Sequence, residues 1–241
     1  MKILVIEPVA NQTLKEKSTG YLESNIPDDV EIEVVMIEKG PLSVETYYDE
    51  VFAAPDVLEI VQRHSSKFDG FLINCFADVG AMAAREITSK PVLGAGEASF
   101  FVAAMLGAPF SIVSIGKNAR NKMTTKFGAY GLSLFKSAVG IELPVVDLEK
   151  DKDQTVEEIV RCARSEMERF GSEAIVLGCT GMSRIAQKVR EKMGIPVIEP
   201  ASASIRALKL LIDLDLHHPR GGRFCPPEPS KIKGYFSGKS V

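Results

Sequence analysis

The chain alternates short, nearly uninterrupted apolar runs with longer stretches whose apolar residues recur at helical spacing. We expect strands at the runs rich in β-branched residues: 2–7, 31–37, 70–75, 91–94, 110–116, 173–179 and 196–200. We expect helices at 56–66, 79–88, 97–106, 117–128, 155–169, 182–192 and 202–214. Thr155 to Glu158 is typical of a capping box at the start of its helix. Regular alternation of strand and helix predicts an α/β fold with mainly parallel sheets that helices cover on both faces.

The order of these elements occurs twice. FDGFLINCFADVG places Cys75 at the end of one apolar run, and SEAIVLGCTGM places Cys179 at the end of another. A Pro-Val strand and a helix follow each cysteine. We therefore predict two pseudo-symmetric three-layer α/β lobes, at 1–106 (completed by the tail 215–241) and at 107–214. Because parallel sheets bind ligands beyond the carboxyl ends of their strands, the active site is expected in the cleft between the lobes.

Composition excludes several classes of protein. The 241 residues are 45% apolar and 25% charged with a net charge of −3, and no basic block points to nucleic acid. No apolar run approaches the roughly 18 residues of a membrane span, and MKILVIEPVANQ is typical of a first strand and not of a signal peptide. The four cysteines stand singly, which argues against a metal site or a disulfide framework. We expect a cytoplasmic protein that binds no metal, nucleic acid or membrane.

Two cysteines that end strands favour acid/base chemistry. A thiol between a strand and a helix lies near unpaired backbone N–H groups, which favour the thiolate. Thr180 and Gly181 add donors beside Cys179, whereas Asp78 adds a carboxylate beside Cys75. One thiolate could remove a proton from carbon while the other thiol delivers one to the opposite face, which is racemisation without a cofactor. Cysteine is also a common core residue, and we expect only that role for Cys162 and Cys225.

The chain resembles the hydantoin racemase branch of the aspartate/glutamate racemase superfamily over nearly its whole length. The resemblance rests on GPLSVETYYDE, AAPDVLE, INCFADVGAMAARE, PVLGAGEAS, IVLGCTGM and PVIEP. It implies two α/β lobes, Cys75 and Cys179 as the two acid/base residues, a small cyclic ureide or amino acid as substrate, and no cofactor.

The resemblance also implies a set of substrate-binding residues. They are Ser43 and Tyr47 in a covering loop, Phe76, Asp78, Gly96 and Glu97 around the first cysteine, and Thr180 and Gly181 beside the second. Simpler roles remain open for three of them. Asp78 and Glu97 could cap the helices that follow, and Tyr47 could pack against its lobe.

The turn after the first strand departs from the family pattern. Hydantoin racemases have an Asn-Pro-Asn type of turn here, whereas this chain has Glu7-Pro8-Val9-Ala10-Asn11. An ionised Glu7 can only accept hydrogen bonds, so it would repel a substrate carboxylate and attract an amine or a ring N–H. We expect Glu7, Pro8 and Asn11 to contact the substrate, with Asn11 compensating in part for the change.

Other functions compete with racemisation. Related enzymes decarboxylate malonate-like acids, which needs only one thiol, or isomerise unsaturated diacids, which needs clamps for two carboxylates. A two-lobed protein could also bind a small molecule without catalysis. A redox sensor that pairs Cys75 with Cys179 ranks last. A disulfide needs Cα atoms within about 7 Å, and a cleft wide enough for a substrate should hold the two cysteines farther apart. The sequence leaves a homo-oligomer possible.

Overall fold

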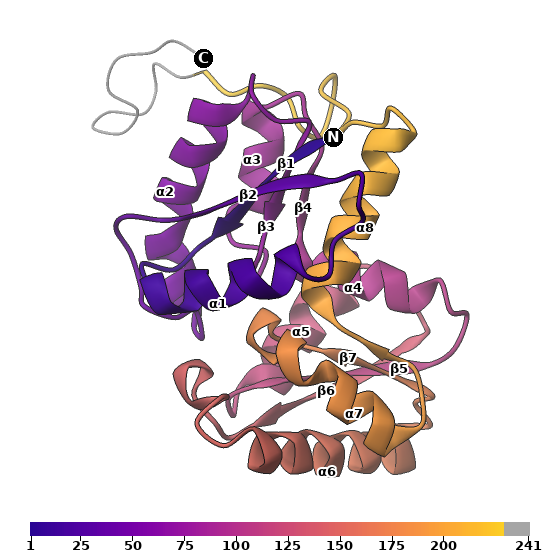
Figure 1. Cartoon of the computed structure of the whole chain (residues 1–241). Coiled ribbons are helices and arrows are strands. Elements are labelled where there is room, and N and C mark those ends of the chain that lie inside the picture. The colour runs from indigo at the N-terminus through magenta and orange to yellow at the C-terminus, as the bar shows by residue number, and fades with distance from the viewer. Residues whose placement is uncertain (229–241) are drawn as a thin grey trace. The chain divides into compact units, whose positions relative to one another are not determined.

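The computed structural model describes residues 1–228 and divides the chain into two compact units. Unit 1 comprises residues 1–94 and the chain from 204 onward, and unit 2 comprises residues 95–203. Each unit is built on one four-stranded sheet whose strand pairs are all parallel (Figure 1). The predicted α/β class with parallel sheets is confirmed.

Unit 1 has the strand order β2-β1-β3-β4. Its elements are β1 (Lys2–Glu7), α1 (Gln12–Glu23), β2 (Glu31–Met36), α2 (Tyr47–His64), β3 (Gly70–Ile73), α3 (Ala81–Ile87), β4 (Val92–Gly94) and most of α8 (Pro200–Asp213). Successive residues of a strand point to opposite faces, so the central strands β1 and β3 are apolar almost throughout. Ile6 and Ile73 join the buried cluster with Val57 of α2 and Ala84 of α3. Helices α1 and α8 cover the other face (Figure 1).

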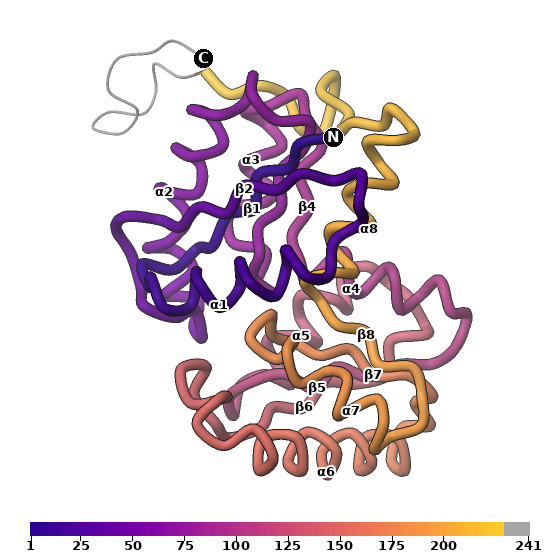
Figure 2. Tube along the Cα trace, viewed as in Figure 1, coloured from indigo at the N-terminus to yellow at the C-terminus, as the bar shows by residue number. Residues whose placement is uncertain are grey.

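Unit 2 repeats this arrangement with the order β6-β5-β7-β8 (Figure 2). Its elements are α4 (Ala95–Ala104), β5 (Phe110–Ile115), α5 (Ala119–Gly128), β6 (Phe135–Ile141), η1 (Val145–Asp147), α6 (Lys152–Phe170), β7 (Ala174–Leu177), η2 (Thr180–Ile185), α7 (Ala186–Met193) and β8 (Val197–Ile198). On one face the ring of Phe100 stacks on Phe127 at 4.7 Å between centroids and meets Phe110 edge-on.

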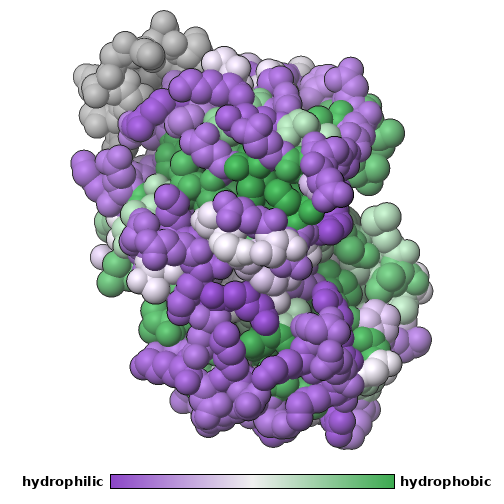
Figure 3. Space-filling model, viewed as in Figure 1, coloured by the Kyte–Doolittle hydropathy of each residue, from purple (hydrophilic) through white to green (hydrophobic). Residues whose placement is uncertain are grey.

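Helices α6 and α7 cover the other face of the second sheet. Val156 and Ile159 of α6 pack with Val189 of α7 and Leu177 of β7 in one buried cluster. The opposite side of α6 is charged and exposed, and it forms the hydrophilic band at the bottom of Figure 3. This amphipathic pattern explains why a helix with little net hydrophobicity is held firmly against the sheet.

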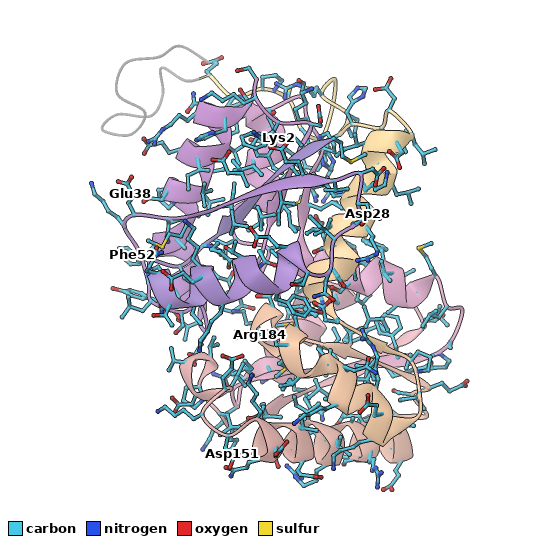
Figure 4. All side chains as sticks on the ribbon, viewed as in Figure 1. Lys2, Asp28, Glu38, Phe52, Asp151 and Arg184 are labelled. Carbon is cyan, nitrogen blue, oxygen red and sulfur yellow. The ribbon has the colours of Figure 1, made fainter. Side chains whose placement is uncertain are left out.

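Four elements differ from the sequence-based expectation. Helix α1 and strand β6 were not predicted, because α1 buries only Leu22 and β6 is an edge strand with the polar sequence FKSAVGI. Helix α2 begins at Tyr47, well before the predicted start at 56, and continues through Pro55. The capping box predicted at Thr155 is wrong: Asp151 caps α6 by accepting from the N–H of Gln154, and Thr155 lies inside the helix (Figure 4 labels Asp151).

The boundaries of the compact units differ from those of the predicted lobes, because the last helix of each predicted lobe belongs to the other unit. Helix α4 belongs to unit 2, where its Phe100 joins the aromatic cluster, and α8 from Ser204 onward belongs to unit 1. A Cβ on Gly70 would lie 3.0–3.3 Å from the side chains of Leu208 and Ile212, so α8 packs directly on β3. The predicted tail 215–241 is described as far as 228, and its remaining residues lie outside the described part.

The described part of the tail is attached to unit 1. The side chain of His218 lies 3.0 Å from the N–H of Val92 in β4, and the guanidinium of Arg220 donates to the carbonyl of Thr88. The ring of Phe224 is buried, whereas the next residue, Cys225, is exposed, so the core role expected for Cys225 is wrong. These contacts hold His218 against β4 and Arg220 against the residue that follows α3.

Candidate active site

Cys75 lies in a tight turn directly after β3. The N–H of Cys75 donates to the carbonyl of Ile73 at 2.8 Å, and the carbonyl of Cys75 accepts from the N–H of Asp78 at 3.0 Å. The side chain of Cys75 is half-buried against the core of unit 1, while Phe76 beside it is almost fully buried. The turn therefore holds a partly accessible thiol at the carboxyl end of a central strand.

Asp78 has a left-handed backbone conformation, with φ of 56°. Aspartate tolerates this region better than most residues do. Its carboxyl group packs against the Cα of Gly94, where an added Cβ would lie only 2.0 Å from Asp78 Oδ1. Asp78 is not the N-cap residue of α3, because that helix begins after Gly80. The Asp78 carboxylate thus lies in the same turn as the Cys75 thiol.

Glu7 ends β1 and is buried inside unit 1. Its Oε1 accepts from the hydroxyl of Ser18 in α1 at 2.5 Å and from Nδ2 of Asn74 at 2.6 Å. The same amide group also donates to the Ser18 oxygen at 2.9 Å. Burial raises the pKa of Glu7 to about 7, and the two hydrogen bonds offset only part of this effect. The carboxyl group of Glu7 is therefore hydrogen-bonded to Asn74, the residue immediately before Cys75.

The turn after β1 is joined to the loop that the sequence predicts as a substrate cover. The N–H of Ala10 donates to the carbonyl of Pro41 at 2.8 Å, and Nδ2 of Asn11 donates to the carbonyl of Leu42 at 3.2 Å. The oxygen of Asn11 caps α1, and Pro8 is buried. Of the two predicted loop residues, Ser43 donates to Glu45 at 3.1 Å and Tyr47, the first residue of α2, is 60% exposed.

Cys179 occupies the matching place in unit 2. It follows β7 and caps the short helix η2, with its Sγ accepting from the N–H of Gly181 at 3.3 Å. The half-buried thiol is followed by Thr180 and Gly181, both partly exposed. Arg184 of η2 forms an ion pair with Glu149, which fixes the outer side of this turn (Figure 4 labels Arg184). A backbone donor at the sulfur favours a thiolate there.

The two predicted residues of α4 lie in its first turn. Gly96 and Glu97 are both buried, Glu97 being 6% exposed. Helix α4 starts at Ala95, so Glu97 is the third residue of the helix. Within unit 1 the structure brings together Cys75, Phe76 and Asp78 in one turn; within unit 2 it brings together Cys179, Thr180 and Gly181.

Sequence reasoning missed the residues that support the two cysteine turns. Asn74 is 2% exposed and binds Glu7, and Ser114 of β5 donates to the carbonyl of Gly178 at 2.8 Å. The sequence did contain a signal for Asn74: it is a polar residue directly before Cys75, whereas the matching residue before Cys179 is glycine. Ser18 could not have been found, because α1 itself was not predicted.

No cluster suited to a metal ion occurs among residues 1–228, in the sense of three or more His, Cys, Asp or Glu side chains gathered together. Within the same residues, no helix is both long and apolar enough to cross a bilayer. The two cysteine turns themselves present thiols, the Asp78 carboxylate and backbone donors.

Comparison with known proteins identifies relatives over nearly the full chain. The model of the Asp/Glu/hydantoin racemase family matches residues 3–208. A hydantoin racemase from Pseudomonas sp. (strain NS671) is 33% identical over 218 residues, which cover 89% of this chain and 87% of that protein.

Two solved structures extend this similarity to the fold. An allantoin racemase from Klebsiella pneumoniae is 31% identical with a TM-score of 0.89, covering 97% of this chain and 96% of that one. An allantoin racemase from Pseudomonas fluorescens is 25% identical with a TM-score of 0.91, covering 97% and 100%. The whole two-unit architecture is thus shared with these proteins.

Proposed function

We propose, from the premise that the chain belongs to the Asp/Glu/hydantoin racemase family and is an isomerase of the racemase type, that it racemises a hydantoin or a related ureide such as allantoin. No cofactor takes part in the proposed reaction. The hydantoin branch predicted from the sequence is confirmed by these relatives.

Cys75 and Cys179 are the proposed acid/base pair. The observation that carries this proposal is that each half-buried thiol directly follows the third strand of its sheet, one residue beyond the hydrogen-bonded end of that strand. For one enantiomer, one thiolate takes the proton from the stereogenic carbon and the other thiol gives a proton to the opposite face. For the other enantiomer the roles are reversed.

The intermediate is an enolate of the ring carbonyl, and it needs hydrogen-bond donors. Thr180 provides a hydroxyl beside Cys179 for this role, and Gly181, whose N–H donates to the Cys179 sulfur, is a further proposed contact at the same turn. We propose that Pro8, Asn11, Ser43 and Tyr47 bind the ring from unit 1, together with Phe76 and Asp78. Gly96 and Glu97 are the proposed contacts from α4. Both cysteines must stay reduced, which agrees with the cytoplasmic location expected from the sequence.

The test is proton NMR in D₂O with 5-substituted hydantoins, allantoin, free amino acids and arylmalonates. The wild-type protein should replace the proton on the stereogenic carbon by deuterium and racemise a ureide. Cys75→Ser and Cys179→Ser should each reduce racemisation by about 10³-fold or more, because proton delivery to one face is lost. Each of these two variants should retain deuterium exchange with only one enantiomer. The enantiomer that still exchanges should differ between Cys75→Ser and Cys179→Ser.

The other two cysteines provide matched controls. Cys162 is buried in α6 and Cys225 is exposed in the tail, so Cys162→Ser and Cys225→Ser should leave racemisation within about twofold, since neither thiol reaches the reacting carbon. Equal loss in these controls would contradict the assignment to Cys75 and Cys179. Loss of CO₂ from arylmalonates that depends on one cysteine would favour a decarboxylase, and tight binding without exchange would favour a non-catalytic binding protein.

A further inference from the structure

Both cysteine turns are supported by a side chain from the neighbouring strand. Ile6 pairs with Ile73 in unit 1, and Val113 pairs with Leu177 in unit 2. The residue that follows each of the strands β3 and β7 donates its N–H to the carbonyl of the partner on the neighbouring strand: Asn74 to Ile6 at 2.9 Å and Gly178 to Val113 at 2.7 Å. The following residues on the supporting strands, Glu7 and Ser114, therefore occupy equivalent places.

Each of these two residues holds the residue that precedes a cysteine. Glu7 accepts from the side-chain amide of Asn74 at 2.6 Å, and Ser114 donates to the backbone carbonyl of Gly178 at 2.8 Å. Both pairs are buried. The two units thus share one device, but its chemistry differs. The support in unit 2 is a neutral hydroxyl, whereas the support in unit 1 is a group that gains or loses a charge.

The surroundings of Glu7 leave that charge without a counter-ion. Among the described residues, α1 presents the Ser18 hydroxyl, the segment after β3 presents the Asn74 amide, and β2 places Met36 opposite Glu7. No ion pair with Glu7 occurs in this part of the chain, and Cys75 is the next titratable residue along the segment after β3. An acid in such a site changes its charge near neutral pH, and here burial raises the pKa to about 7.

We propose that Glu7 is a positioning residue that acts through Asn74 on the Cys75 turn, so that proton transfer by Cys75 depends on the charge of Glu7 and proton transfer by Cys179 does not. This inference rests on the proposed roles of the two cysteines. It adds a second role to the substrate contact expected for Glu7 from the sequence.

The mechanism follows from the two hydrogen bonds at Oε1. An ionised Glu7 accepts charge-assisted bonds from Ser18 and Asn74, which fix the residue before Cys75. A protonated Glu7 offers only neutral bonds and becomes a donor itself, so the hold on Asn74 weakens. The Cys75 turn is therefore best ordered above neutral pH. The Ser114 hydroxyl does not titrate in this range, so the Cys179 turn keeps one geometry.

The experiment isolates one thiol at a time. Cys179→Ser leaves Cys75 as the working base, and Cys75→Ser leaves Cys179. Deuterium exchange into a 5-substituted hydantoin is followed from pH 5.5 to 9, after subtraction of the rate without protein. With Cys75 alone, the logarithmic slope of the exchange rate should rise above one around pH 7, because ionisation of the thiol and ionisation of Glu7 both favour exchange. With Cys179 alone, the slope should stay near one.

Variants of the network then assign the second ionisation. Adding Glu7→Gln to Cys179→Ser should return the slope to one and reduce the exchange rate at pH 8 about fivefold, since a neutral amide holds Asn74 less strongly. Ser18→Ala removes one donor to the carboxylate and should move the break in the profile to higher pH. Ser114→Ala is the matched control, since it removes the equivalent support in unit 2 and should leave the Cys75 break in place.

A substrate-free measurement separates this inference from the proposed function. The alkylation rate of Cys75 by iodoacetamide, read by mass spectrometry of its peptide over the same pH range, should show the same two-step profile in the wild type and one step in Glu7→Gln. If both single-cysteine variants still racemise, the proposed function fails while the alkylation profiles still test Glu7. Superimposable Cys75 profiles in wild type and Glu7→Gln, or a break unmoved by Ser18→Ala, would overturn the role of Glu7. Melting temperatures of all variants show whether they are folded.

Discussion

The turns after β3 and after β7 share a position in the sheet and differ in polarity. The Cys75 turn contains Asp78, and Asn74 before it is hydrogen-bonded to the buried Glu7, so two carboxyl groups lie at this turn. The Cys179 turn carries Thr180 and Gly181, and a backbone N–H lies 3.3 Å from the sulfur. Repetition of the backbone has preserved where each thiol lies. The side chains around each thiol have diverged, and we propose that they set how each thiol responds to charge.

The second difference concerns space at the residue before each cysteine. Asn74 has a side chain that reaches Glu7, whereas at Gly178 an added Cβ would lie 2.5 Å from the Cβ of Ser114. The Cβ–Cβ distance is far below van der Waals contact, and the nearest atoms sit close to the backbone. Unit 2 therefore packs two strands more closely at this point than unit 1 does. Four substitutions test how the two units differ.

The largest expected effect is that of Gly178→Ala. It should lower the free energy of unfolding by about 3 kcal/mol, because Ser114 cannot move away without shifting β5. Urea titration followed by circular dichroism measures it. Asn74→Ala at the equivalent place should cost less, about 1–2 kcal/mol, because it removes the hydrogen bonds to Glu7 and Ser18. Recovery of stability in Gly178→Ala with Ser114→Gly would confirm the clash, and equal losses at the two places would contradict it.

Glu7→Gln should change how stability depends on pH. The pKa of Glu7 is about 7 in the folded chain against an ordinary 4.5, so the folded state binds the proton more tightly. Its contribution to stability is thus fully present below about pH 4.5 and is lost as the pH rises through 7. Relative to wild type, Glu7→Gln should gain about 2–3 kcal/mol in unfolding free energy between pH 5 and pH 8.

Chemical unfolding of both proteins at each pH measures this gain. A constant difference between wild type and Glu7→Gln would show that Glu7 has an ordinary pKa in the folded chain. Glu31→Gln is a suitable control, because that carboxylate is exposed on β2 of the same sheet and should give no such trend.

Glu166→Gln should change stability at pH 8 in the opposite direction to Glu7→Gln. Glu166 is as buried in unit 2 as Glu7 is in unit 1, but it accepts from the guanidinium of Arg120 at 2.7 Å and from the hydroxyl of Ser137. Loss of the charge should reduce stability at pH 8 by about 2 kcal/mol, since Arg120 loses its ion-pair partner. The measurement is again unfolding in urea. Stabilisation by this change would mean that the two buried acids are equivalent.

The smallest expected effect concerns the start of α2. The Thr46 hydroxyl and the Asp49 carboxylate form a capping box, and Tyr47 follows the cap directly. Thr46→Ala should lower stability by about 1 kcal/mol and loosen the first turn that carries Tyr47. If Tyr47 covers the substrate, KM should rise severalfold with little change in kcat. Asp151→Ala removes the cap of α6 in unit 2 and should cost similar stability without altering KM.

The elements that were predicted and those that were missed differ in how much apolar surface they bury. Strands β1, β3 and β7 are central and buried on both faces, so their apolar runs are visible in the sequence. Helix α1 buries only Leu22, and β6 lies at a sheet edge with Lys136 and Ser137 in it. Such elements are stabilised by their neighbours more than by their own pattern, and a pattern search cannot find them.

The same reasoning applies to the candidate site. By itself the sequence determined the α/β class, the repeated order of elements and the two cysteines that end equivalent strands, because these depend on local hydrophobic periodicity. Only the tertiary structure decided that Glu7 lies beside Asn74 and Ser18, or that Ser114 supports Gly178. The contacts of Glu7 with Asn74 and of Ser114 with Gly178 join residues 67 and 64 positions apart through the pairing of parallel strands. Burial and hydrogen bonding across such a separation set the charge of a side chain, and no local pattern encodes them.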